Sequence, residues 1–167
     1  MRSLIWLAIL AMALTCVGCG GGSEEESAPE IPVTHGGQED AYQTAVFAQQ
    51  RAEWEALAEQ GDSKAQRQLG MMYYLGQGMD ADYDAAYAWL DKAAAQGDDI
   101  AQLTLGVMHV EGQGVESDKV AAHMWFSLSL QQGNPSAQIR LDRLLAEMTD
   151  EEIAEAEQRA QDWTPSI

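Results

Sequence analysis

The sequence predicts an all-α fold: a short right-handed α-solenoid of antiparallel helix pairs, about seven helices in all, with a capping helix at each end. The first observation is a pattern of Gly, Ala, Leu and Trp that recurs every 36 residues, as in Gly61, Gly97 and Gly133, a period typical of stacked helix pairs. Within each period the apolar residues lie three and four apart, which is the spacing of one helix face. Glycine and acidic or amide residues separate these segments, as expected at helix ends.

The chain begins with a segment that predicts export rather than folding. Residues 4–14, LIWLAILAMAL, follow a single Arg and carry no charge, and they are too few to span a membrane, which takes about 20 residues. Residues 1–18 are therefore interpreted as a signal peptide. The next residue, Cys19, stands between two glycines and resembles the lipidation site of bacterial lipoproteins; Cys16 is the alternative. The resemblance implies a lipid anchor, palmitate included, on one of these cysteines.

Residues 19–40 are predicted to be the lipidated cysteine and a disordered acidic tether. Their sequence after Cys19, GGGSEEESAPEIPVTHGGQED, has few apolar residues, so it cannot bury enough surface to offset chain entropy. A flexible chain of this length spans about 25 Å. Both cysteines of the protein precede residue 20, so the remaining domain is expected to fold by packing alone.

The charge balance limits the classes of partner. The chain has 27 acidic and 9 basic residues, for a formal net charge of −18. Nucleic-acid binding depends on neutralising phosphates with Lys and Arg, so no nucleic-acid partner is expected. Contact with a membrane is expected through the lipid anchor only, because such a surface repels anionic lipid.

The repeat divides the remaining chain into segments. They are a capping helix (41–60), repeat one (61–96), repeat two (97–132), a partial repeat (133–148), and a closing helix with a tail (149–167). In each repeat we expect a first helix, as at 63–75, and a second helix, as at 82–96. Asp62, Asp82, Asp98, Asp118, Asn134 and Thr149 are expected to cap helix N-termini. The residues that recur in equivalent structural positions are Gly70, Gly76, Gly78, Asp82, Trp89, Gly97, Gly106, Gly112, Gly114, Asp118, Trp125 and Gly133.

Two of these glycines lie inside predicted helices and need a physical reason. A mid-helix Gly costs about 1 kcal/mol relative to Ala. We expect Gly70 and Gly106 to allow close approach of the paired helix, which presents a small Ala-Ala face, while Trp89 and Trp125 fill the space between neighbouring pairs. The third unit has Asp142 at this position, so close pairing is expected to end there.

Two units of the chain share one pattern of residues. They are AQRQLGMMYYLGQGMDADYDAAYAWLDKAAAQGD and AQLTLGVMHVEGQGVESDKVAAHMWFSLSLQQGN. Both units resemble the Sel-one-like repeat, a branch of the tetratricopeptide-like helical repeats. The resemblance rests on AQ-x-x-LG, then G-x-G, then D-x-x-x-A-x-x-W, then QG, over about half of the chain. It implies a solenoid that acts as an interaction scaffold, and many such proteins belong to bacterial envelopes. A cysteine-rich subgroup is linked to β-lactam binding, which is not expected here because the repeats contain no cysteine.

No motif for catalysis, a cofactor or a metal stands out. Asp80, Asp82 and Asp84 occupy the first ligand positions of a calcium loop, but Ala85 replaces the required Gly; a turn followed by a helix cap is the favoured interpretation. His109 and His123 lack a third ligand. The protein is therefore predicted not to be an enzyme.

The better candidate for a site is a strip on the first helices of the units. Residues three and four apart that vary between repeats define it, with Ile100 beside them. They are Arg67, Met71, Tyr74, Ile100, Leu103, Val107, Val110, Ile139 and Arg143. Two interpretations remain open: a partner-binding groove flanked by arginines, or packing against neighbouring helices.

Together these patterns predict a non-catalytic envelope lipoprotein whose repeat scaffold mediates protein–protein interaction. We expect a monomer whose partner is an unidentified envelope protein. The alternative is a binding module for peptidoglycan fragments or a small ligand. The chain is expected to face the periplasm, and Gly20 after the lipidated cysteine favours the outer membrane over the inner one.

Overall fold

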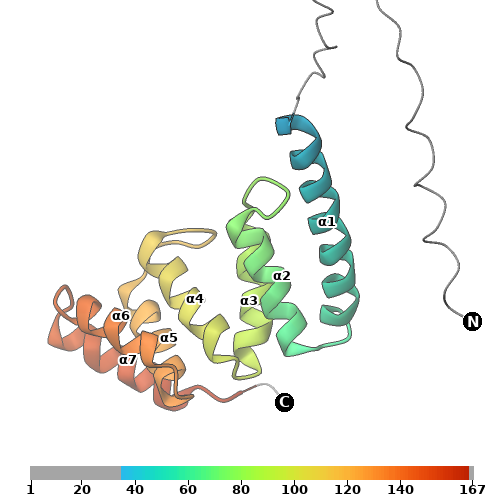
Figure 1. Cartoon of the computed structure of the whole chain (residues 1–167). Coiled ribbons are helices and arrows are strands. Elements are labelled where there is room, and N and C mark those ends of the chain that lie inside the picture. Colours follow the sequence, from blue (N-terminus) through green and yellow to red (C-terminus); the bar gives the residue numbers. More distant parts are fainter. Residues whose placement is uncertain (1–34, 166–167) are drawn as a thin grey trace, which may run out of the picture. The chain divides into compact units, whose positions relative to one another are not determined.

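The computed structural model describes residues 35–165, and the helices in this part succeed one another from α1 at one side to α6 and α7 at the other (Figure 1). No strand occurs within residues 35–165. The expected signal peptide, the lipidated cysteine and most of the tether lie outside the described residues. The helices are α1 His35–Ala58, α2 Ser63–Leu75, α3 Tyr83–Ala95, α4 Asp99–Glu111, α5 Lys119–Gln131, α6 Pro135–Leu145 and α7 Asp150–Asp162.

The predicted N-caps are confirmed for every helix from α2 to α7. Asp62 accepts a hydrogen bond from the backbone N–H of Ala65 at 2.7 Å, and the other three aspartates repeat this contact. Thr149 forms the expected capping box with Glu152. Each such cap stabilises its helix by about 1 kcal/mol. The aspartates around residue 82 therefore belong to a turn and a cap, as predicted.

The second glycine of each GQG turn packs against the second helix of the preceding unit. A Cβ on Gly114 would overlap the backbone of Tyr83 at the start of α3, and a Cβ on Gly78 would lie 2.7 Å from Cβ of Phe47 in α1. Both glycines also have positive φ, which other residues rarely adopt. The equivalence shows that α1 takes the place of a second helix and covers the first repeat.

A glutamine in each repeat joins its first helix to the end of the helix before it. The Nε2 of Gln66 donates to the carbonyl of Ala58, at 3.1 Å, and Gln102 makes the same contact with Ala94, at 3.2 Å. Both carbonyls lie at a helix C-terminus, where each also accepts from the backbone N–H of the glycine three residues later, so the glutamine supplies a second donor. The equivalent Gln138 instead bonds the side chain of Asp142 within α6, so this link is lost in the third unit.

Close approach at Gly70 and Gly106 is confirmed, but the opposing groups differ from the prediction. A Cβ on Gly70 would lie 2.7 Å from Cγ of Leu90, and a Cβ on Gly106 would overlap the ring of Phe126. One of the expected alanines does face Gly70, because the backbone oxygen of Ala86 lies 3.2 Å from that Cβ position. The nearest atoms at both glycines, however, belong to larger side chains, which fill the space that the missing Cβ leaves. The reason is that Leu90 and Phe126 lie one turn beyond the alanines on the paired helix.

The tryptophans pack between helix pairs. Trp125 is 7% exposed and belongs to the main core of α3, α4, α5 and α7, where its ring meets that of Trp163 edge to face at 6.3 Å. Trp89 packs with Trp54 against the smaller core between α1 and α2, and the Lys92 ammonium lies 3.8 Å from the centre of its ring. Trp54 of the capping helix thus joins this core despite its different register in the sequence.

One boundary differs from the prediction. Helix α1 begins at His35 rather than near residue 41, so residues 35–40, assigned to the disordered tether from their composition, are helical.

Helix α7 packs against α5 and has few contacts with α6. Close pairing therefore ends after the second repeat, as the replacement of glycine by Asp142 indicated. Within residues 35–165 no helix is long and apolar enough to cross a bilayer.

Candidate functional site

The strip predicted from the sequence follows the first helices α2, α4 and α6, and its residues differ in exposure. Ile100, Val110 and Ile139 are 40%, 44% and 60% exposed. Met71, Tyr74, Leu103 and Val107 are half-buried. Some residues of the strip therefore pack against neighbouring helices while others remain in contact with solvent, and binding of a partner by the strip stays a prediction.

The first of two grooves along this strip lies between α1, α2 and α4. It has a volume of about 420 Å³. Trp54 and the methionines supply apolar surface, and three glutamine amides supply hydrogen-bonding groups. The groove is lined by Gln50, Trp54, Arg67, Gln68, Met71, Met72, Leu75, Gln77 and Ile100.

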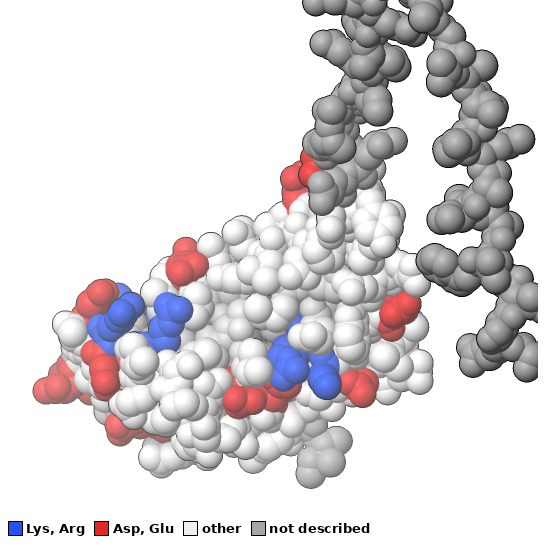
Figure 2. Space-filling view, viewed as in Figure 1, with Lys and Arg blue, Asp and Glu red and all other residues white. Residues whose placement is uncertain are grey.

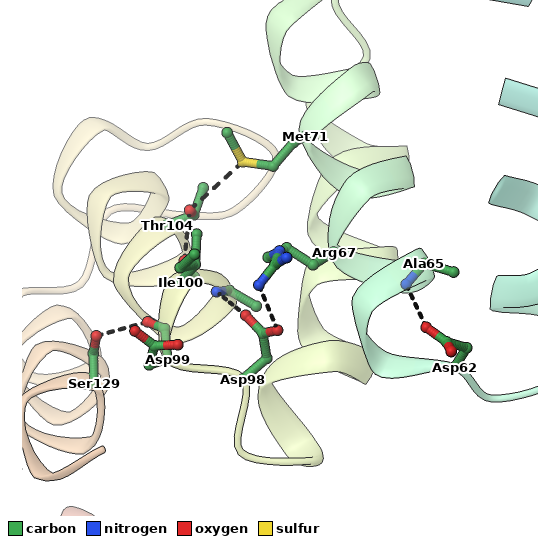
Figure 3. A network of polar contacts seen from close by, with 10 residues as sticks. Asp62, Ala65, Arg67, Met71, Asp98, Asp99, Ile100, Thr104 and Ser129 are labelled. Carbon is green, nitrogen blue, oxygen red and sulfur yellow. Dashed lines mark hydrogen bonds and ion pairs between the residues drawn. The ribbon is translucent and has the colours of Figure 1, made fainter. Parts of the chain in front are cut away.

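Arg67 lies in this groove, but its charge is paired within the protein. Its Nη1 is 3.0 Å from Oδ2 of Asp98, and the two side chains are only 17% and 10% exposed (Figure 3). The other carboxylate oxygen of Asp98 accepts from the backbone N–H of Ala101 at 2.9 Å and caps α4. One carboxylate therefore caps α4 and ties it to α2, so Arg67 connects the two repeats.

A second contact between the repeats lies one turn further along. The Thr104 hydroxyl donates to the carbonyl of Ile100 at 2.8 Å and lies 3.8 Å from the sulfur of Met71 (Figure 3). These contacts position Met71 and Ile100 at the junction of α2 and α4. The junction between the repeats thus forms one wall of the first groove.

The second groove lies between α4 and α6, with α5 beneath it. It has a volume of about 230 Å³. Phe126 and Leu144 form its buried floor, and Leu103 and Val107 pack against the same cluster. The groove is lined by Val107, Val110, Glu111, Phe126, Arg140, Arg143, Leu144 and Glu147. Ile139 lines neither groove and lies exposed on α6.

Sequence reasoning missed Arg140, Glu111 and Glu147 in this second groove. The signal for Arg140 was present, since it precedes Arg143 by three residues and shares its helix face. Tyr74 of α2 lies near the same groove. Its pKa is raised by burial and by the Glu111 carboxylate, whereas Arg140 acts in the opposite direction.

The histidines lie outside both grooves and have structural neighbours. Nε2 of His109 lies 3.3 Å from the hydroxyl of Tyr87, and the two rings meet edge to face. Nδ1 of His123 lies 3.4 Å from the hydroxyl of Ser127. Burial lowers the pKa of each histidine below its usual value. In the part of the chain that the structure describes, no three His, Cys, Asp or Glu side chains are grouped so that they could hold a metal ion.

Comparison with known proteins identifies the repeats. The Sel1 repeat model matches residues 63–98 and 99–134, and each match begins at the first residue of α2 or α4. The comparison with curated proteins finds no relative.

Several solved structures share the fold, among them the following two. One is a protective antigen present in uropathogenic Escherichia coli strains that displays an SLR fold; it is 27% identical, with a TM-score of 0.66 over 75% of this chain and 29% of that chain. The other is a Sel1 repeat protein from Oxalobacter formigenes, which is 38% identical, with a TM-score of 0.53 over 55% of this chain and 26% of that chain. This chain spans less than a third of the length of either protein. It carries two consecutive Sel1 repeats, formed by the helix pairs α2–α3 and α4–α5, within an all-α solenoid of the SLR fold.

Proposed function

We propose that this protein is a non-catalytic scaffold of the bacterial envelope that binds another protein through the face formed by α2, α4 and α6. The observation that supports it best is the pair of grooves along that face, with exposed Ile100, Val110 and Ile139 beside or between them. Apolar groups gathered around grooves are typical of interaction sites. Sel1 repeats commonly serve as protein-interaction modules, which adds to this support.

A non-catalytic role is supported by the placement of the titratable groups. The buried histidines have packing partners and lie away from both grooves. A general acid or base must reach a bound substrate within hydrogen-bond distance. The grooves offer apolar surface, amides and arginines, which fit recognition. The second groove also contains the carboxylates of Glu111 and Glu147, but both are exposed and Glu147 is paired with Lys119, so neither is set up for proton transfer in a buried site.

Attachment to the envelope is proposed from Cys19, or Cys16 as the alternative, with the outer membrane favoured over the inner one. Labelling cells with radioactive palmitate tests it directly. The wild-type protein should be labelled and should partition into detergent, and Cys19→Ala should abolish both while Cys16→Ala leaves them intact. An unlabelled wild-type protein would refute the lipid anchor without affecting the role of the repeats.

The experiment for the scaffold role is site-specific photo-cross-linking in native membranes. A photoreactive residue replaces Ile100 in the first groove or Val110 in the second, and Glu155 on the exposed side of α7 is the control position. The proposal is supported if one protein is captured reproducibly from a groove position and is not captured from Glu155. Absence of capture at both groove positions, or equal capture at Glu155, contradicts it.

The alternative function is a site for peptidoglycan fragments or a small ligand, and the first groove favours it. Trp54 and three glutamines line about 420 Å³ there, a combination of aromatic surface and a few polar groups that suits small-molecule recognition. Binding of muropeptides that is lost on Trp54→Ala would support this alternative. Unchanged tryptophan fluorescence with added muropeptides would exclude it.

A further inference from the structure

Most basic side chains in the described part of the chain already have partners within the protein. This matters because the whole sequence has only nine basic residues and a formal net charge of −18. Unpaired basic groups are therefore rare on its surface. Those with a partner are Arg51 with the sulfur of Met79, Arg67 with Asp98, Lys92 with Trp89, Lys119 with Glu147, and Arg159 with Asp118 and Glu155.

Arg140 and Arg143 differ from this pattern. They lie one turn apart on α6, are both exposed, and line the second groove. Among the described side chains, residues 40–165, neither forms an ion pair with a carboxylate. Figure 2 shows one of two groups of basic side chains over the α6–α7 end of the molecule, on a face that is otherwise largely uncharged or acidic. Two guanidinium groups thus stand beside an apolar cavity with their hydrogen-bonding capacity unused by ion pairs.

Two carboxylates share the groove and must be considered with the arginines. Glu147 is held by Lys119, whose Nζ lies 3.3 Å from its Oε2. Glu111 lies at the end of α4 and, within residues 40–165, forms no ion pair. The four charged side chains that line the groove balance in number, two basic and two acidic. Because Lys119 beside the groove pairs with Glu147, the groove and its rim together carry three basic and two acidic groups, an excess of one positive charge. Charges further away than about 8 Å are largely screened at physiological salt, so this local excess governs contacts within the groove.

The chemistry of the lining defines what the groove fits. Paired guanidinium groups bind carboxylates through charge-assisted and often bidentate hydrogen bonds. Val110, which is 44% exposed, and the half-buried Val107 offer apolar surface for one or two aliphatic side chains, above the buried Phe126 and Leu144. At about 230 Å³, the cavity suits a short peptide segment better than a folded surface.

We propose that the second groove binds an acidic segment of the partner protein, with carboxylates on Arg140 and Arg143 and a neighbouring aliphatic side chain against Val107 and Val110. This inference rests on the proposed scaffold function and specifies its partner. A second copy of this chain is the competing occupant, and sedimentation of a variant that lacks both arginines separates it from a partner protein.

The test is fluorescence polarisation with the full chain in detergent and three labelled hexapeptides. GSEEVL combines carboxylates with aliphatic residues, GSKKVL reverses the charges, and GSEEGG removes the aliphatic residues. We expect saturable binding of GSEEVL, and at least tenfold weaker binding of the other two. Arg140→Gln combined with Arg143→Gln should weaken GSEEVL binding at least tenfold, a loss of about 1.4 kcal/mol.

Two matched variants separate local recognition from net charge. Lys64→Glu makes the chain more negative by two charges, as does the double arginine variant, but Lys64 is an exposed residue of α2 outside both grooves. It should leave the affinity for GSEEVL within about twofold. Glu111→Gln should strengthen binding, because it removes the unpaired carboxylate that repels the peptide. Circular dichroism of each variant confirms that the helices are retained.

Several results would overturn the proposal. The first is that GSKKVL binds as tightly as GSEEVL, and the second is that GSEEVL shows no saturable binding up to about 1 mM. The third is that the double arginine variant binds GSEEVL with full affinity. The fourth is that the wild-type chain sediments as a dimer whereas the double arginine variant sediments as a monomer. The last result would make a second copy the occupant. Cross-linked capture of a partner at Ile100 or Val110 that persists in the double arginine variant would refute the acidic segment alone and leave the scaffold role standing.

Discussion

Replacing Gly106 with Ala tests the close contact between α4 and α5. The new methyl group would overlap the ring of Phe126, which is 1% exposed and packed among Ala122 and Leu144. Overpacking of this kind costs about 1–3 kcal/mol, and the contact favours the upper end because the ring has no free space. Alanine in place of a helical glycine contributes about 1 kcal/mol in the opposite direction. We therefore expect a net loss of about 2 kcal/mol in the free energy of unfolding.

The assay is urea unfolding followed by far-UV circular dichroism, in wild type and in a Phe126→Leu background. Leucine shortens the opposing side chain, so the overlap is relieved and only the helix-propensity gain remains. Gly106→Ala should then stabilise the protein by up to about 1 kcal/mol, and its effect changes sign between the two backgrounds. Equal losses in both backgrounds, or a wild-type background that is stabilised, would refute the reasoning.

Three further predictions concern caps, the last helix and acid. Asp98→Ala removes the cap of α4 and leaves the guanidinium of Arg67 partly buried without a partner. The free energy of unfolding should therefore fall by about 2–3 kcal/mol. Asp98→Asn keeps a capping oxygen and should lose less stability in the same urea assay. Trp163→Ala removes an aromatic ring that packs on the main core. It should lower the free energy of unfolding by about 2 kcal/mol and expose the amides of α7 to hydrogen exchange. Unchanged exchange in α7 would contradict this role. His109 and His123 have pKa values lowered by burial, so as the pH falls the unfolded chain binds protons at these histidines before the folded chain does. Stability should be full above about pH 6.5 and fall as the pH drops below it. The double variant His109→Gln with His123→Gln should show a smaller loss.

The helix ends could be predicted from the sequence because their causes are local. Asp62 and Asp118 accept hydrogen bonds from backbone groups two or three residues away, and such contacts are encoded in short segments. The start of α1 was predicted less well. Residues 35–40 are rich in glycine and polar side chains, which indicated a disordered tether, yet they continue a helix that packs on α2 further along.

The candidate site was only partly predictable. Periodicity placed Val107, Val110 and Arg143 on one face, since residues three and four apart share a side of a helix. Periodicity could not show that Arg67 pairs with Asp98, 31 residues away. It also could not identify Arg140 as a residue that lines the second groove. Those outcomes depend on which side chains neighbouring helices bring together.

The sequence by itself determined that the protein is a helical repeat, where the helices from α2 onward begin and end, and which glycines allow two helices to approach. Its period of 36 residues and its caps are local or repeated signals, so they do not require knowledge of distant contacts. Only the tertiary structure decided that Leu90 and Phe126 oppose these glycines, that Arg67 is paired, and that Arg140 and Arg143 remain unpaired beside an apolar groove. The crossing of the helices sets these distances, and no pattern along a single helix contains them.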